Sequence, residues 1–392
     1  MLKKTSNTYY YHLDFIRFFV VFFVLLHHWV SETPFKFLPF ASTVAFVLSA
    51  FLLTKGLLEE KNLISTNTKS NWIVIKAYFW RRSLRIFPIY YLLIIVAYLI
   101  NWKGEFKSHS VYYFTFLQNF DMVRNSYSGV GIVHTWSIAV QEQFYLVLPF
   151  IVLFLSKKVI KYPFLIMVIV GILSRSYYFF MQYPFRYNHF LTECTLDCFG
   201  IGGIIAILYI YYPKKFKKFL KKEIYFYLVL IIYILSFILF TMNSNVDIYK
   251  SGFYTALELK NRVLVEQHNN FYRVLERLFI PLLSIWLIGW GMFDMYSHVW
   301  NTIFKNRTIL YLSKISYGIY LYHFPVFLIL RKILIYFKYN EHGFFAISTY
   351  FIFTILISSF SYYFFEKPIM DWNKNREARK AEKIYSKECE AV

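Results

Sequence analysis

Long apolar runs recur along the whole chain and are separated by short polar or basic segments. A helix that crosses about 30 Å of hydrocarbon needs roughly 20 mostly apolar residues. Ten segments reach or approach this length, so the pattern predicts an all-α, polytopic integral membrane protein with about ten transmembrane helices. The predicted spans are residues 13–30, 37–58, 84–101, 138–156, 163–182, 190–212, 224–242, 274–296, 315–337 and 343–365.

The remaining segments are short. Apolar residues 110–120 cannot span, and we expect them to lie at an interface or to re-enter the membrane. No stretch outside the spans is long enough for a second folded domain. We therefore expect residues 1–366 to form one transmembrane domain and residues 367–392 to form a charged cytoplasmic tail.

The composition agrees with this pattern. Of the 392 residues, 58% are hydrophobic, 23% are aromatic and only 17% are charged. Soluble domains hold about 45–50% apolar and about 25% charged residues, so an ordinary soluble domain is excluded. The three cysteines, Cys194, Cys198 and Cys389, lack the spacing of a disulfide framework or a zinc site, and we expect no bound metal.

The chain carries a formal net charge of +21. No compact basic domain remains outside the spans, so we expect no nucleic-acid partner. Lys and Arg collect in the cytoplasmic loops of membrane proteins. If the N-terminus is cytoplasmic, about two thirds of the 43 Lys and Arg residues fall on the inner side, and KKFKKFLKK at 214–222 is the densest group. This distribution predicts that both termini are cytoplasmic.

Ionisable residues mark one face of the first span. Arg17 and His28 are eleven residues apart, about three helical turns plus 20°, so they share a face and stand about 16 Å apart. Asp14 joins this face, whereas His27 points about 100° away. A neutral imidazole can take a proton from a hydroxyl or attack a thioester. His28 is therefore either a catalytic residue or an interfacial histidine that hydrogen-bonds a neighbouring helix.

Two arginines open the third span. Arg82 and Arg85 are i, i+3 neighbours on one helical face. Guanidinium groups bind phosphate bidentately, so this pair is a candidate site for a phosphorylated cytoplasmic ligand. The alternative is the ordinary enrichment of basic residues at the inner membrane boundary.

The fourth span begins with HTWSIAVQEQFYLVLP, residues 134–149, which is more polar than a lipid-facing helix. Glu142 is ionisable and is flanked by amides. This cluster is either functional or an ordinary interfacial helix start.

In the ninth span, His323 precedes Pro325, and a packed histidine there would satisfy backbone groups that the proline frees. The glycines at 200, 202 and 203 predict close helix packing.

Seven segments, in this order, resemble the membrane-bound acyltransferase 3 family of bacterial O-acyltransferases. They are LDFIRFFVVFFVLLHH, AFVLSAFLLTKGLL, RRSLRIFPIYY, HTWSIAVQEQFYLVLP, TLDCFGIGGIIA, SYGIYLYHFPV and FFEKP, and they run from residue 13 to 368. The resemblance implies a ten-span core in the bacterial cytoplasmic membrane. It implies transfer of an acyl group, commonly acetyl, from cytoplasmic acyl-CoA to a hydroxyl of an extracytoplasmic or cell-surface carbohydrate.

The family's patterns assign expected roles to individual residues. Its arginine–ten residues–histidine pattern falls on Arg17 and His28, and its Arg-x-x-Arg pattern falls on Arg82 and Arg85. From the resemblance we expect His28 and Glu142 to be catalytic. The expected substrate-binding residues are Asp14, Arg17, Arg82, Arg85, Trp136, Ser137, Gln141, Tyr145 and His323.

Two positions depart from the family's pattern. Gln141 stands where the family usually has the first of two glutamates, and Thr195 stands where it often has an arginine two residues before Asp197. The chain ends about 25 residues after FFEKP, so we expect no SGNH-type esterase domain.

The expected partners are acyl-CoA, a glycan or glycolipid acceptor and membrane lipid, with no permanently bound cofactor. The protein is expected to act alone, as a homodimer or with a separate periplasmic acyltransferase. The alternative function is transport of lipid-linked or acylated sugars. Such transporters often carry internal repeats, and the two halves of this chain show no obvious repeat.

Overall fold

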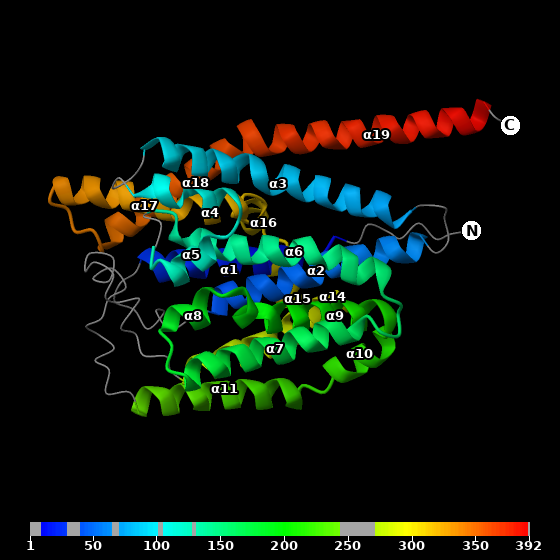
Figure 1. Ribbon diagram of the computed structural model, residues 1–392, viewed down its shortest axis with the longest axis horizontal. Helices are drawn as coiled ribbons and strands as arrows, with labels where there is room; N and C mark the ends of the chain where they lie inside the picture. The colour runs from blue at the N-terminus through cyan, green and yellow to red at the C-terminus, as the bar shows by residue number, and fades with distance from the viewer. Residues whose placement is uncertain are drawn as a thin grey trace.

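The structure is a computed structural model that describes residues 9–29, 40–64, 70–100, 105–127, 131–243 and 271–390. All regular elements in these ranges are helical. The long helices lie side by side in one bundle (Figure 1). They are α1 (Tyr11–Trp29), α2 (Phe40–Ile64), α3 (Asn71–Ile100), α6 (Trp136–Phe154), α7 (Lys161–Phe180), α9 (Leu196–Tyr211), α11 (Ile224–Asn243), α14 (Phe271–Met292), α17 (Ser316–Tyr336), α18 (Phe344–Ser361) and α19 (Lys367–Glu390).

Short helices connect these long ones. They are α4 (Phe106–Phe114), α5 (Gln118–Arg124), η3 (Val133–Thr135), α8 (Phe185–Phe190), η4 (Thr192–Thr195), α10 (Pro213–Leu220), α15 (His298–Phe304), α16 (Arg307–Lys314) and the π-helix η5 (Tyr362–Glu366). The predicted interfacial segment 110–120 is divided between α4 and α5. Through η5, α18 continues into α19, so the predicted tail is helical as far as Glu390.

The predicted all-α membrane fold is confirmed. Eight helical segments of the described chain are long and apolar enough to cross a membrane. The other two predicted spans correspond to α11 and α14, whose apolar segments Ile224–Ser236 and Arg277–Met292 are shorter. The third span begins at Asn71, well before the predicted residue 84.

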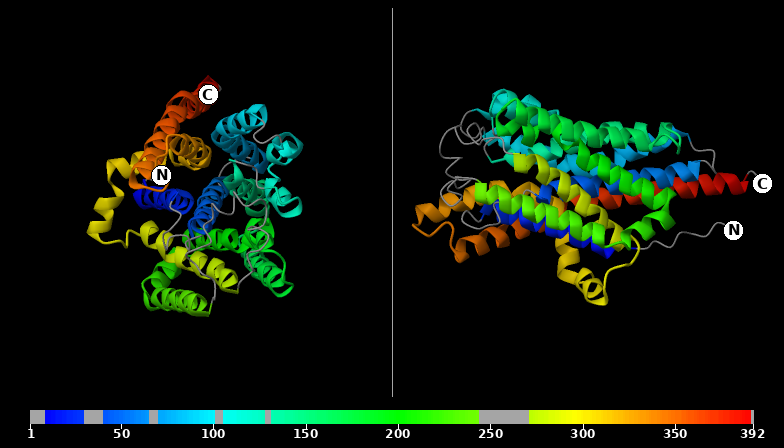
Figure 2. Two further views of the ribbon diagram at one scale, coloured as in Figure 1. Left: turned by 90° about the vertical axis from the view of Figure 1, so that its left-hand side faces the viewer. Right: turned by 90° about the horizontal axis from the view of Figure 1, so that it is seen from below.

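The outward faces of several long helices are apolar and exposed, as expected of surfaces that contact lipid. Exposed aliphatic side chains on these faces are Ile95, Val96 and Leu99 on α3, Ile166, Ile169 and Leu173 on α7, Ile231 and Leu235 on α11, and Ile352 and Leu356 on α18. Seen along the bundle, α1 and α2 lie near the middle, with the other helices around them (Figure 2).

Small residues let the central helices approach closely. On α9, Gly202 faces the backbone of α2, and a Cβ added there would come within 2.7 Å of the Ala50 Cβ. A Cβ at Gly203 would overlap the Phe164 ring of α7. These contacts confirm that the glycine cluster serves close helix packing.

The start of α1, the basic helix α10 and the end of α19 all lie at one end of the bundle (Figure 1). The lysine-rich segment therefore shares its end with both described chain ends. A chain that crosses the membrane an even number of times has both of its ends on the same side, and this arrangement agrees with that.

A buried ion pair joins α7 to α9. The Arg175 Nη2 lies 2.6 Å from the Asp197 Oδ2, and Nη1 lies 2.8 Å from Oδ1. Nη1 also donates to the Cys194 carbonyl at 2.7 Å. The two side chains are only 1% and 0% exposed. Position 195, where the family often has an arginine, holds the uncharged Thr195. The cation that pairs with Asp197 comes instead from α7.

We expect Arg175→Gln or Asp197→Asn to destabilise the protein by about 3–5 kcal/mol, because either change leaves an uncompensated buried charge. The double variant Arg175→Met/Asp197→Leu should recover most of this loss. Thermal unfolding in detergent measures all three. The matched control is Glu341→Gln, which breaks the more exposed Arg331–Glu341 pair and should cost at most about 1 kcal/mol. Equal losses at both pairs would contradict the prediction.

Candidate active site

Three histidines from three helices meet inside the bundle. His28 lies in the last turn of α1, His134 in η3 and His323 in α17. The ring centroids of His28 and His323 are 5.1 Å apart, and those of His323 and His134 are 4.7 Å apart. His134 and His323 are buried, and His28 is half-buried. We call these three residues the histidine cluster.

A proline fixes the position of His134. Pro325 has no N–H, so the carbonyl of Leu321, four residues earlier in α17, lacks its helical donor. The Nε2 of His134 lies 3.0 Å from this oxygen. The expectation that His323 would bond the freed carbonyl is therefore wrong, because His323 Nδ1 instead lies 2.6 Å from the carbonyl of Tyr320.

Hydroxyl groups hold η3 and α6 against α17. The Tyr320 hydroxyl donates to the His134 carbonyl at 2.6 Å. It also lies 2.6 Å from the Ser137 Oγ. Ser137 thus belongs to the surroundings of the histidine cluster. Trp136 points elsewhere, and its ring packs against the rings of His189 at 4.8 Å and Phe190 at 5.4 Å.

A second group of charges gathers three arginines from two helices. Each arginine has a carboxylate as an electrostatic neighbour. Arg17 forms an ion pair of 2.6 Å with Asp14, Arg82 interacts with Glu142, and Arg85 interacts with Glu366 of η5. We call these six residues the arginine cluster. The prediction that Arg17 and Asp14 share a face is confirmed by their contact.

Within the arginine cluster, Arg82 and Arg85 keep hydrogen-bonding capacity. The Arg82 guanidinium lies 4.0 Å from the centroid of the Tyr145 ring, and the Tyr145 hydroxyl donates to Gln141 at 3.0 Å. Among the described residues, the Arg82 Nε has no hydrogen-bond partner. The Arg85 side chain is exposed although Arg17 of α1 and Glu366 of η5 are its charged neighbours. The buried, unpartnered Arg82 Nε and the exposed Arg85 side chain suit an anionic ligand.

Two helices connect the clusters. On α1, Arg17 and His28 stand about 16 Å apart along the axis. On α6, Ser137 lies beside the histidine cluster, and Glu142 lies in the arginine cluster. Apart from Trp136, the predicted site residues therefore divide into two groups, and Glu142 belongs to the group without imidazoles.

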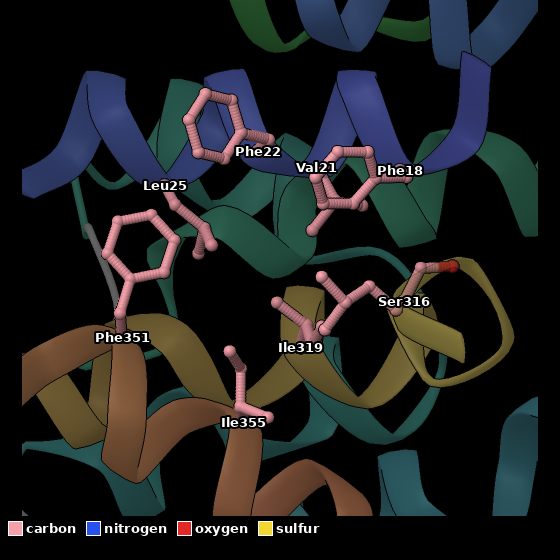
Figure 3. Close-up of a pocket in the computed structure, with 9 residues that line it drawn as sticks. Phe18, Val21, Phe22, Leu25, Ser316, Ile319, Phe351 and Ile355 are labelled. Atoms are coloured by element: carbon pink, nitrogen blue, oxygen red, sulfur yellow. The ribbon is translucent and has the colours of Figure 1, made fainter. Parts of the chain in front are cut away.

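An apolar pocket lies between α1 and the helices α16, α17 and α18 (Figure 3). Its cavity volume is about 20 Å³, which is room for one small group. Leu25 is three residues before His28, and Ile319 is four residues before His323, so the pocket lies one helical turn from both rings. The lining residues are Phe18, Val21, Phe22, Leu25, Leu312, Ser316, Ile319, Phe351 and Ile355.

Two residues of the site, His134 and Glu366, were not among the site residues predicted from the sequence. His134 opens the HTWS segment, two residues before the predicted Trp136. Glu366 is the acidic residue of FFEKP, and its buried Oε1 has no hydrogen-bond partner within the described chain. Both lie in segments already singled out, but the contacts that give them a role come from other helices.

The described residues contain no group of three or more His, Cys, Asp or Glu side chains that could hold a metal ion. The groups that this part of the chain brings to the site are imidazole, guanidinium, carboxylate and hydroxyl groups.

The sequence is similar to known O-acetyltransferases. It is 23% identical over 94% of its length to the O-acetyltransferase OatA of Staphylococcus aureus, and this match covers 58% of OatA. It is 26% identical over 82% of its length to a putative O-acetyltransferase of S. aureus strain COL, and covers 51% of that protein. The chain thus spans little more than half the length of these relatives.

No solved structure matches the chain significantly. The family described as acyltransferase domain matches residues 10–364, which is nearly the whole chain. This range contains the histidine cluster, the pocket and all of the arginine cluster except Glu366, which lies just beyond it. The protein therefore belongs to the acyltransferase 3 family.

Proposed function

We propose that the protein is a membrane-embedded O-acyltransferase. It moves an acyl group, acetyl in the first place, from cytoplasmic acyl-CoA to a hydroxyl of an extracytoplasmic or cell-surface carbohydrate. The observation that carries the proposal is the pair of clusters at two levels of one bundle, joined by α1 and α6. The names of the relatives support acetyl as the group transferred.

The arginine cluster is the proposed donor end. Coenzyme A carries phosphates, and the guanidinium groups of Arg82 and Arg85 bind phosphate through charge-assisted hydrogen bonds. Asp14 already pairs with Arg17 at 2.6 Å, so Arg82 and Arg85 are the better candidates for phosphate contacts. The apolar pocket lies further along α1, and its volume of about 20 Å³ suits a small apolar group such as the methyl group of acetyl.

The histidine cluster is the proposed place of reaction. The acceptor hydroxyl oxygen attacks the thioester carbonyl while the His28 imidazole takes the hydroxyl proton. The carbon–sulfur bond then breaks, and the leaving thiolate takes the proton from His28. A route through a transient acyl-His28 uses the same ring as nucleophile. General base catalysis supplies about 10²–10⁴-fold, and positioning of both substrates must supply much of the remainder.

We expect His28→Ala to abolish acyl transfer while the protein still inserts into the membrane, because this change removes the proposed base. The assay is covalent transfer of radiolabelled acetyl from acetyl-CoA to a glycan acceptor by purified protein. His27→Ala is the matched control, since this neighbour points about 100° away on the helix, and it should keep most of the activity. Full activity of His28→Ala would rule out the assigned role.

Arg82→Ala and Arg85→Ala should each weaken coenzyme A binding by about 10- to 100-fold, because a hydrogen bond to a charged group contributes about 1.5–3 kcal/mol. Titration calorimetry with coenzyme A and protein in nanodiscs gives the Kd. Arg81→Ala is the control, since Arg81 is an exposed neighbour on the same helix. An unchanged Kd in both cluster variants would place the donor elsewhere.

We also propose that the protein resides in the bacterial cytoplasmic membrane with both termini in the cytoplasm. Lys218 on α10 and Lys338 after α17 are both exposed. In a Cys389→Ser background, a membrane-impermeant maleimide should label Lys338→Cys in intact cells. It should label Lys218→Cys only after permeabilisation, because α10 lies on the inner side. The reverse pattern would invert the topology.

A further inference from the structure

Backbone carbonyls fix the protonation of two rings in the histidine cluster. A carbonyl oxygen can only accept a hydrogen bond, so the ring nitrogen that contacts it must carry the hydrogen. His134 contacts the Leu321 carbonyl through Nε2 at 3.0 Å. In the neutral form of this ring, Nδ1 is then the bare, accepting nitrogen.

His323 has the opposite tautomer. Its Nδ1 contacts the Tyr320 carbonyl at 2.6 Å, so Nδ1 carries the hydrogen and Nε2 is the accepting nitrogen. The two rings thus present different nitrogens as acceptors, although their centroids are only 4.7 Å apart.

Both accepting nitrogens lack a partner in the part of the chain that the structure describes. The residues are only 3% and 0% exposed, and a buried acceptor without a donor costs free energy. The nearby hydroxyls of Ser137 and Tyr320 are already engaged with each other and with the His134 carbonyl. What completes the site is a ligand that donates hydrogen bonds.

The ligand would lie beside the proposed catalytic ring, since the His28 centroid is 5.1 Å from that of His323. The inference rests on the proposed function, in which the acceptor is a carbohydrate. We infer that a hydroxyl adjacent to the one that is acylated lies between His134 Nδ1 and His323 Nε2 and shares its single hydrogen between them in a three-centre hydrogen bond. The protein therefore selects acceptors with two neighbouring hydroxyl groups, and it discriminates against acceptors that lack the second one.

Amide side chains test each nitrogen separately. In His323→Asn the amide nitrogen replaces the donating Nδ1 and nothing replaces Nε2, whereas in His323→Gln the amide oxygen replaces the accepting Nε2. At position 134 the logic reverses. His134→Asn keeps an acceptor near Nδ1, and His134→Gln keeps the donor to Leu321 but loses the acceptor.

The probes are methyl glucoside, mannoside and galactoside, each with its monodeoxy derivatives, and radiolabelled acetyl-CoA. For the sugar that the wild-type protein acetylates best, loss of the hydroxyl next to the acylated one should lower kcat/KM by roughly tenfold or more. This difference should become smaller in His323→Asn and in His134→Gln, because each removes one of the two accepting nitrogens. It should persist in His323→Gln and His134→Asn, so that sugar and side chain form a double-mutant cycle.

The outcomes separate the two claims. A deoxy penalty that stays the same in all four variants would overturn the inference, and so would a wild-type protein that treats diol and deoxy sugars alike. Acetyl transfer to none of the sugars would overturn the proposed function itself. Nitrogen-15 NMR of histidine-labelled wild-type protein adds a readout that needs no variant. It should show one Nε2–H and one Nδ1–H tautomer for His134 and His323, and the opposite tautomers would overturn the inference.

Discussion

The geometry of the histidine cluster depends on Pro325, whose backbone nitrogen carries no hydrogen. Pro325 cannot donate to the Leu321 carbonyl, and in a membrane-spanning helix this oxygen must find another donor within the protein. His134 provides it at 3.0 Å. The bond attaches η3 to the middle of α17 and holds the His134 ring beside that of His323, with Nδ1 lacking a partner among the described residues. A proline that would weaken a soluble helix therefore determines the geometry of the site.

The low polarity of the bundle interior also explains why each arginine of the arginine cluster has a carboxylate nearby. Three guanidinium groups inside one bundle would repel each other strongly, but a carboxylate from α1, α6 or η5 accompanies each of them. Only the Arg17–Asp14 contact is a close ion pair. The looser pairing of Arg82 and Arg85 leaves these two able to exchange a protein carboxylate for the anionic groups of a ligand. The division into a charged cluster and a neutral imidazole cluster separates substrate anchoring from proton transfer.

Much of this arrangement could be predicted from local sequence pattern, because the length of apolar runs and helical periodicity are local properties. The spans followed from run length, and the shared face of Asp14, Arg17 and His28 followed from the helical repeat. The role of His134 could not be predicted in this way, since its partner lies 187 residues away in the chain. The same holds for Glu366 beside Arg85 and for the neighbours of Glu142, which depend on how separate helices pack.

The bond between Arg175 and Asp197 has a consequence for how α7 and α9 depend on each other. Neither side chain can be lost alone, because the other charge would then stay buried between the two helices without its partner. The cation that balances Asp197 stands 22 residues earlier in the chain. The polar environment of Asp197 is therefore set by the facing helix and not by its neighbours in sequence.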